Sequence, residues 1–253
     1  MGTDRTGKTA VITGGGRGFG KDFGEALAAE GAHVVLVDID SAEAEAAAAG
    51  IRAKGNLATG LQGDVTDEPR MLAIMAEAAA VQGGPNAGID ILINNAGLHS
   101  DEYGQPILKM GYAKTKRLFE VNVMGTVCCT LAAAPYMQGR AGACVVNISS
   151  SAAHMHGSAY GDSKLAVAGL TITFGRELAP VRVNAISPGL MLTNTIRAEL
   201  PPETMARVKA MQWLEEDGGP EHIVDAMLFL TSPQARFITG EVLRVTGGMA
   251  AGV

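Results

Sequence analysis

The feature that most constrains this chain is a regular alternation between short apolar runs and longer helical patterns. The runs VVLV, within His33–Asp38, and ILI, within Ile89–Ile93, are almost continuously hydrophobic, as strands covered on both faces of a parallel sheet must be. Helical patterns separate consecutive runs, and such crossovers produce a doubly wound sheet that binds ligands outside the carboxyl ends of its strands. The chain is therefore expected to adopt an α/β fold.

The pattern predicts about seven strands with helices on both faces. The predicted strands are Thr9–Thr13, His33–Asp38, Leu57–Gln62, Ile89–Ile93, Ala143–Ile148, Val181–Ile186 and Glu241–Val245. The predicted helices are Phe19–Glu30, Ser41–Lys54, Pro69–Gln82, Thr115–Met137, Ser158–Leu178 and Glu221–Leu230. No linker or repeat divides the 253 residues, so we expect one domain, 1–253. The segment 190–219 departs from the rhythm and is either a lid over the strand ends or a surface excursion.

Charge and composition narrow the partners and the compartment. A net charge of −6 disfavours nucleic acid and anionic membranes, which attract basic patches. We see no uninterrupted apolar run long enough to span a bilayer, and the polar start Met1–Lys8 shows no secretory signal. Cys128, Cys129 and Cys144 have no metal-ligand spacing, so we expect buried free thiols, no metal site and a cytoplasmic location.

A glycine-rich turn, TGGGRGFG, joins the first strand to the first helix at residues 13–20. Glycines let the backbone approach a pyrophosphate, and the helix amino terminus supplies amide donors. Asp38 ends the second strand twenty residues after Gly18, where a carboxylate accepts from ribose hydroxyls and repels a 2′-phosphate. Arg17 favours the opposite preference because a guanidinium can pair with that phosphate. We give Asp38 more weight, which favours NAD and leaves NADP open.

Tyr160 and Lys164 lie four residues apart on a predicted helix and so project from one face. A free phenol, with a pKa near ~10, is a poor base at neutral pH, but a nearby ammonium favours the phenolate. Ser149, Ser150 and Ser151 end the preceding strand, and one of their hydroxyls can hold a reacting carbonyl oxygen. Asn122, a poor helix former inside a helix, can hold a water toward Lys164 through its side chain or a distorted backbone.

These motifs together resemble the short-chain dehydrogenase/reductase family over essentially the whole chain. TGGGRGFG, Asp64, NNAG at 94–97, Asn122, NISS, YGDSK and Pro188–Gly189 occur in the family's order. The resemblance implies a Rossmann fold and a catalytic tetrad of Asn122, Ser150, Tyr160 and Lys164. Tyr160 would be the general acid/base, Ser150 would orient the carbonyl, and Lys164 would lower the tyrosine pKa and bind the nicotinamide ribose.

The resemblance also implies a set of residues that contact the cofactor. Thr193 would hold the nicotinamide carboxamide, and residues 186–189 would line the nicotinamide pocket. The full set is Gly14, Arg17, Gly18, Phe19, Gly20, Asp38, Asp64, Val65, Asn95, Ala96, Gly97, Tyr160, Lys164, Pro188, Gly189, Met191 and Thr193. Two departures stand out: the loop from Ser150 to Tyr160 is short, and Thr246 occupies a position where the family often has an acid.

The sequence predicts an NAD-dependent oxidoreductase that acts on a carbonyl or secondary alcohol and is, by resemblance, a homotetramer. Candidate substrate contacts are Leu98, His154, His156 and Met191, although an exposed loop is the simpler interpretation of the two histidines. Two alternatives stay open. One is an NADPH-dependent reductase of carrier-protein-bound 3-oxoacyl groups that docks through Arg140 and Arg176. The other is a dinucleotide-binding sensor without catalysis. Substrate identity and reaction direction are not predicted.

Overall fold

The computed structural model describes residues 3–155, 157–192 and 202–249 and contains a seven-stranded, all-parallel sheet with the order β3-β2-β1-β4-β5-β6-β7. The strands are β1 (Thr9–Thr13), β2 (His33–Asp38), β3 (Ala58–Gln62), β4 (Ile91–Asn94), β5 (Cys144–Ile148), β6 (Arg182–Pro188) and β7 (Val242–Val245). The strand order reverses between β1 and β4, and this switch point is where doubly wound sheets bind their ligands. The predicted fold class is confirmed.

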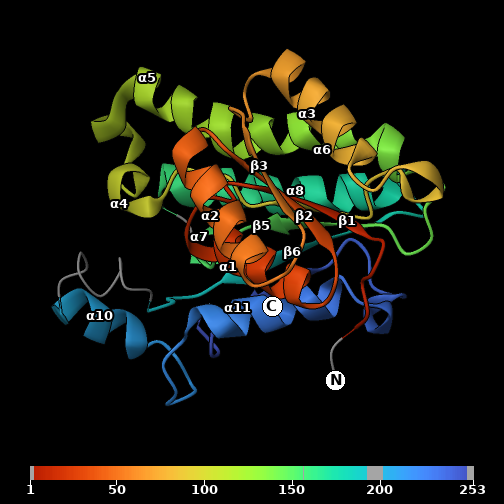
Figure 1. Ribbon diagram of the computed structural model, residues 1–253. Coiled ribbons are helices and arrows are strands. Elements are labelled where there is room, and N and C mark those ends of the chain that lie inside the picture. Colours follow the sequence, from red (N-terminus) through yellow and green to blue (C-terminus); the bar gives the residue numbers. More distant parts are fainter. Residues whose placement is uncertain (1–2, 156, 193–201, 250–253) are drawn as a thin grey trace.

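Helices cover both faces of the sheet (Figure 1). Alternate residues of each strand enter opposite cores: Ile12 packs with residues of α1, α2 and α11, whereas Val11 packs with residues of α3, α6 and α8. The helices are α1 (Gly18–Ala29), α2 (Ser41–Ala53), α3 (Glu68–Ala80), α4 (Ser100–Tyr103), α5 (Ile107–Phe119), α6 (Gly125–Met137), α7 (Ala152–Met155), α8 (Ala159–Glu177), α10 (Pro202–Lys209) and α11 (Pro220–Leu230). Short turns η1 (Gly84–Asn86), η2 (Glu120–Met124) and η3 (Pro233–Ala235) complete the chain.

The predicted helix Thr115–Met137 is wrong in two respects. It begins earlier, at Ile107, with a break at Gly111 (φ +74°), and the π-helical turn η2 divides it into α5 and α6. By length and composition alone the stretch Ile107–Met137 could cross a membrane, but half of its most apolar window is buried inside the protein. Because α6 packs against α3 and contributes Ala133 to the core, this apolar character serves folding.

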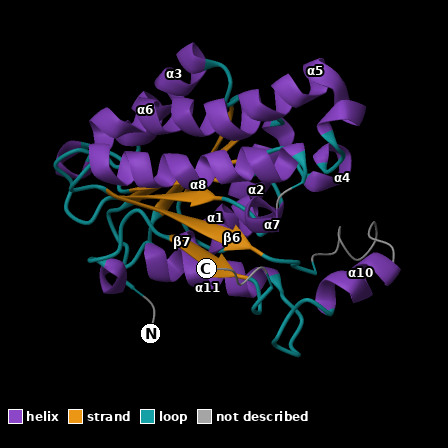
Figure 2. Ribbon diagram, turned by 180° about the vertical axis from the view of Figure 1, so that it is seen from behind, coloured by secondary structure: helices purple, strands orange, loops and turns teal. Residues whose placement is uncertain are grey.

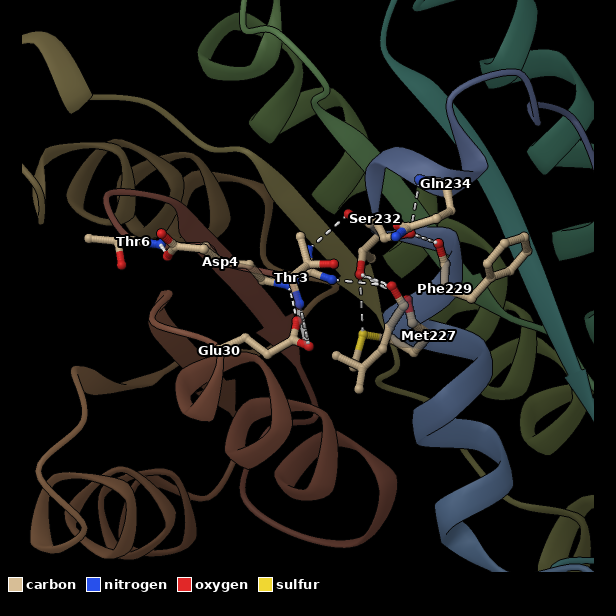
Figure 3. Close-up of polar contacts among 11 residues, drawn as sticks. Thr3, Asp4, Thr6, Glu30, Met227, Phe229, Ser232 and Gln234 are labelled. Carbon is tan, nitrogen blue, oxygen red and sulfur yellow. Dashed lines mark hydrogen bonds and ion pairs between the residues drawn. The ribbon is translucent and has the colours of Figure 1, made fainter. Parts of the chain in front are cut away.

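The amino-terminal segment is tied to the far end of α11 (Figure 3). Buried Arg5 donates to Glu30 Oε2 at 2.6 Å and to the carbonyl oxygen of Thr231 at 2.8 Å. A cavity of about 370 Å³ lies beside these contacts, lined by Thr3, Glu30, Asp225, Leu228, Phe229, Ser232 and Gln234. Glu30 precedes β2, so this cavity lies at the amino ends of the strands, away from the edge that carries the predicted site.

Candidate functional site

The strands point toward the end of the molecule where α4, α7 and α10 lie, as Figure 2 shows for β6 and β7. The loop from β1 to α1 is the first loop of the chain at this edge of the sheet. Gly14 and Gly18 have φ of +63° and +53°, which favours glycine. A Cβ on Gly20 would lie 2.1 Å from the carbonyl oxygen of Gly14, so the turn closes on itself. Arg17 is the N-cap of α1, without a side-chain cap, and the first turn of α1 carries no acidic residue. These amides and this cradle fit a phosphate group.

Asp38 is held against the glycine turn. Its Oδ2 accepts from Gly16 N at 3.0 Å, and its Oδ1 accepts from Asp40 N at 3.1 Å. A Cβ on Gly16 would lie 3.0 Å from Asp38 Oδ2 and 2.8 Å from Glu43 Cβ, so only glycine allows this approach. Each carboxylate oxygen keeps further acceptor capacity, and the carboxylate is oriented at the carboxyl end of β2.

The loop after β4 is joined to the loop after β1. Asn95 Nδ2 donates to the carbonyl oxygens of Thr13 and Gly14 at 3.0 and 2.9 Å, and Ala96 N donates to Thr13 Oγ1 at 3.1 Å. These bonds fix the predicted residues Asn95 and Ala96, which precede Gly97, at the switch point between the two halves of the sheet.

Asp64 and Val65 occupy the same edge after β3. Asp64 Oδ1 accepts from Thr66 N at 2.9 Å, and Asp64 Oδ2 lies 3.3 Å from Arg117 Nη2 of α5. Burial opposes ionisation of Asp64, but the bonds from Thr66 and the Arg117 charge outweigh it and lower its pKa. Val65 is buried against Gly125, where a Cβ would lie 2.5 Å from Val65 Cγ2.

Tyr160 and Lys164 lie in the first turns of α8, which Ser158 caps by accepting from Gly161 N at 3.0 Å. Lys164 Nζ donates to the carbonyl oxygen of Ile148 at 2.8 Å and lies 5.9 Å from the centroid of the Tyr160 ring. Burial disfavours the ammonium form and lowers the pKa of Lys164 to about 8. A buried lysine beside a phenol at a strand edge is typical of functional chemistry.

The three serines after β5 have different environments. Ser149 is buried and its Oγ donates to the carbonyl oxygen of Lys164 at 2.9 Å. Ser151 is also buried, and its N donates to the carbonyl oxygen of Pro188 at 2.8 Å. Ser150 is half-buried, and its Oγ accepts from Ala152 N at 3.2 Å. Of the three serines, Ser150 is the least buried.

Asn122 lies in the π-helical turn η2 and is buried. Its Oδ1 accepts from Leu98 N at 2.7 Å, and its Nδ2 donates to Ser163 Oγ at 3.0 Å and to the carbonyl oxygen of Leu98 at 3.3 Å. A Cβ on Gly97 would lie 3.2 Å from Asn122 Oδ1 and 3.3 Å from Lys164 Nζ. The structure thus brings Asn122, Gly97 and Lys164 together. Because the side-chain amide of Asn122 is already bonded to Leu98 and Ser163, the distorted backbone of η2 is favoured over this side chain as the group that holds a water.

The end of β6 contributes Pro188, Gly189 and Met191. Pro188 is buried, and a Cβ on Gly189 would lie 2.8 Å from Thr246 Cα. Met191 is buried in the core and lines a cavity of about 360 Å³ together with Leu190, Gln212, Leu214, Glu216, Asp217, Gly218, His222, Arg244, Val245, Thr246, Gly247 and Gly248. This placement favours a packing role for Met191 over substrate contact. Thr193, predicted to hold the carboxamide, lies outside the described residues.

The candidate substrate residues differ in placement. Leu98 packs in a small apolar cluster with Tyr103, Leu118 and Tyr160. His154 does not lie in an exposed loop, as the simpler interpretation predicted: it is half-buried on α7, because residues after Ser151 form a helical turn. His156 lies outside the described residues. Of the described residues, no three His, Cys, Asp or Glu side chains are grouped to hold a metal.

Sequence reasoning missed Ser163 and Tyr103. Ser163 is fully buried and joins Asn122 to α8, and its one sequence signal is its position directly before Lys164. Tyr103 comes from α4, a helix too short to show a periodic pattern. All three cysteines are free, as predicted, but the predicted burial holds for Cys129 and Cys144 and not for Cys128, which is half-buried.

Comparison with known proteins finds relatives over nearly the whole chain. Residues 14–250 match the family described as Enoyl-(Acyl carrier protein) reductase. An uncharacterised oxidoreductase of Mycobacterium tuberculosis is 37% identical over 243 residues, which cover 95% of this chain and 96% of that protein. The 7alpha-hydroxysteroid dehydrogenase of Escherichia coli is 32% identical and covers 96% of this chain and 94% of its own length.

A solved structure extends the comparison to three dimensions. A 7 alpha-hydroxysteroid dehydrogenase complexed with NADH and 7-oxo glycochenodeoxycholic acid superposes with a TM-score of 0.88 at 32% identity, covering 97% of this chain and 95% of that one. Family match, relatives and fold all lead to one assignment. The chain belongs to the short-chain dehydrogenase/reductase family of oxidoreductases.

Proposed function

We propose that the protein transfers a hydride between NAD(H) and a carbonyl or secondary alcohol, with Tyr160 as general acid/base. The observation that carries the proposal is the buried Lys164 ammonium, 5.9 Å from the Tyr160 ring centroid at the carboxyl edge of the sheet. NAD, when bound, supplies or accepts the hydride. The chain's own residues bind and orient the substrate and transfer the proton.

The cofactor assignment rests on the turn after β1 and on Asp38. The glycine cradle and the amino terminus of α1 fit a pyrophosphate, and Asp38 stands where ribose hydroxyls would be bound. The Asp38 carboxylate, held by Gly16 N and Asp40 N, puts a negative charge at the position that a 2′-phosphate would need. This arrangement supports NAD over NADP, although Arg17 is exposed at the same turn.

Tyr160 would give its proton to the carbonyl oxygen during reduction and take it back during oxidation. Lys164 stabilises the phenolate, and its bond to the carbonyl oxygen of Ile148 leaves two ammonium hydrogens for the ribose and for a water. Ser150 would donate to the reacting oxygen and orient it toward Tyr160. Asn122 keeps the loop at Leu98 in place beside this centre.

The substrate proposed is a secondary alcohol or ketone on an apolar ring. Leu98 and Tyr103 provide an apolar wall beside Tyr160, and both a similar protein and a similar solved structure bear the name 7alpha-hydroxysteroid dehydrogenase. Such a wall excludes water from one side of the reacting carbon and holds a hydrophobic frame against the phenol.

Docking of a carrier protein through Arg140 is not supported. Arg140 donates to both carboxylate oxygens of Asp90 at 3.1 and 2.8 Å. Asp90 precedes β4, so Arg140 lies at the amino ends of the strands, away from Tyr160. The intact Tyr160–Lys164 pair argues against a sensor without catalysis.

We also propose a cytoplasmic homotetramer formed by chains of one domain, 1–253. Large apolar side chains are exposed on α5, α6 and α8, and beyond α11: Leu108, Tyr112, Leu131, Ile172 and Phe237. Light scattering of the purified protein tests this assembly, and a monomer would contradict it.

Parallel titration with NADH and NADPH tests the function first. Trp213 is 75% exposed and serves as the energy-transfer donor, with calorimetry as a second measurement. A panel of ring ketones and secondary alcohols then gives turnover, and Tyr160→Phe should abolish it while NADH affinity stays nearly unchanged. Retained turnover in Tyr160→Phe, or no binding of either cofactor, would contradict the proposal.

A further inference from the structure

We propose that Ser163 is a positioning residue for the reaction, acting through Asn122. The proposal rests on the proposed function. Ser163 Oγ donates to the carbonyl oxygen of Tyr160 at 2.7 Å and accepts from Asn122 Nδ2 at 3.0 Å. Its hydroxyl therefore joins the π-helical turn to the first turn of α8.

The bond made by Ser163 continues into the loop after β4. Asn122 Oδ1 accepts from Leu98 N at 2.7 Å, so the chain of bonds runs from the Tyr160 carbonyl through Ser163 and Asn122 to Leu98. Ser163 is 0% exposed and Asn122 is 1% exposed, so water does not easily replace a lost partner. Buried bonds of this kind fix side-chain rotamers more firmly than exposed ones.

The network reaches Lys164 through Gly97. A Cβ on Gly97 would lie 3.3 Å from Lys164 Nζ and 3.2 Å from Asn122 Oδ1, so the loop, the amide and the ammonium lie close together. If Asn122 turns, Leu98 loses its acceptor and Gly97 can move toward or away from Lys164. Ser163 thereby determines how Lys164 faces Tyr160 without touching substrate.

The same helix offers a matched control two turns further on. Thr171 Oγ1 donates to the carbonyl oxygen of Val167 at 2.9 Å and accepts from Asn147 Nδ2 at 2.9 Å. Thr171 and Asn147 are both 0% exposed. Thr171 thus makes the same pair of bonds in the core, but its partner Asn147 leads to Asn94 rather than to the loop at Leu98.

The test compares Ser163→Ala with Thr171→Val in the full-length protein. Both variants should lose thermal stability. Ser163→Ala should also lower kcat about tenfold, the scale of one buried hydrogen bond, and move the pH dependence of turnover by roughly one unit. Thr171→Val should leave both unchanged. Ser163→Cys, which keeps a weaker donor and acceptor, should fall between Ser163→Ala and the wild type.

Two further readouts separate positioning from general damage. Hydrogen exchange at the Leu98 amide, measured without cofactor, should accelerate about tenfold in Ser163→Ala and not in Thr171→Val. In the Asn122→Ala background, Ser163→Ala should cost less than twofold in kcat, because its effect passes through Asn122.

Equal kinetics and equal Leu98 exchange in Ser163→Ala and the wild type would overturn the positioning role alone. If Ser163→Ala fails to fold, Ser163→Cys decides by the same readouts. A wild-type protein that turns over no ketone or alcohol would overturn the proposed function, and the positioning role with it.

Discussion

Gly97→Ala should damage the site through contact with two polar atoms. The added methyl would lie 3.2 Å from Asn122 Oδ1 and 3.3 Å from Lys164 Nζ, a few tenths of an ångström too close. Gly97 is not among the glycines with positive φ, so its backbone accepts alanine and the effect is steric. Lys164 is held by its bond to Ile148, and Asn122 by Leu98 and Ser163, so neither group moves without weakening a bond.

The magnitude follows from two opposing terms. Overpacking a buried site lowers the free energy of unfolding by about 1–3 kcal/mol. Replacing glycine by alanine reduces the conformational entropy of the unfolded chain, which raises the free energy of unfolding by about 0.4–1 kcal/mol. The variant should therefore lose between roughly 0 and 2.5 kcal/mol of stability. Displacement of Lys164 from Tyr160 should cost more in turnover, up to about a hundredfold, which is the effect of misplacing a catalytic group by about 1 Å.

Urea unfolding and the pH dependence of kcat, measured on the same preparation, check this reasoning. Gly50→Ala is the control, because a Cβ at that helical position meets nothing within 4 Å; it should gain about 0.5–1 kcal/mol and keep wild-type turnover. Wild-type kcat and pH dependence in Gly97→Ala would refute the claim that this contact positions Lys164.

Three further predictions concern charges at the site. Asp38→Asn should raise NADPH affinity relative to NADH at least tenfold because one repelling charge is lost, and an unchanged ratio in parallel titrations would contradict the ribose assignment. The pKa of Lys164 is lowered from 10.5 to about 8 in the folded protein. Between these two pH values Lys164 therefore binds more protons in the unfolded chain than in the folded one, so the free energy of unfolding rises with pH through this range. Lys164→Met should thus be more stable than the wild type at pH 7, by roughly 1–3 kcal/mol once the lost bond to Ile148 is subtracted. This difference in stability should be smaller at pH 10. Unfolding curves at both pH values test the reasoning, and an equal difference at the two pH values would contradict it. Arg117→Met should change stability by less than about 1 kcal/mol, since the ion pair with Asp64 is half-exposed. It should weaken NADH binding several-fold because Asp64 loses a partner that orients it. Titration with NADH at several salt concentrations measures this effect, and an unchanged affinity would show that Arg117 does not support the site.

Much of the sheet was predictable because its strands are simple apolar runs. Five predicted strands match the observed bounds within one residue at each end, and β4 and β6 are each displaced or extended by one or two residues. Parallel strands buried on both faces need hydrophobic residues at nearly every position, so a continuous apolar run such as VVLV is enough to identify one.

The interrupted long helix was not predictable from local pattern. The π-helical turn at Asn122 depends on bonds to Leu98 and Ser163, which are 24 and 41 residues away in the chain. Helix α7 was missed because four residues carry no period. The choice of Ser150 came from resemblance alone, and its structural support lies in the burial of Ser149 and Ser151 and in the bond from the Ser149 hydroxyl to the carbonyl oxygen of Lys164.

The segment that follows β6 is closed at its base by backbone bonds. Leu192 N donates to the carbonyl oxygen of Gly218 at 2.8 Å, and Trp213 N and Leu214 N both donate to the carbonyl oxygen of Gly247, at 2.8 and 3.1 Å. These bonds use amides and carbonyls, so they do not depend on side chains inside the segment. Since loop-closure entropy grows slowly with length, a grafted segment of different sequence or length should leave the sheet, Tyr160 and Asp38 intact. The fold can thus exchange the segment between Leu192 and Gly218 at small energetic cost, because the sheet and the base of the segment are held independently of its sequence.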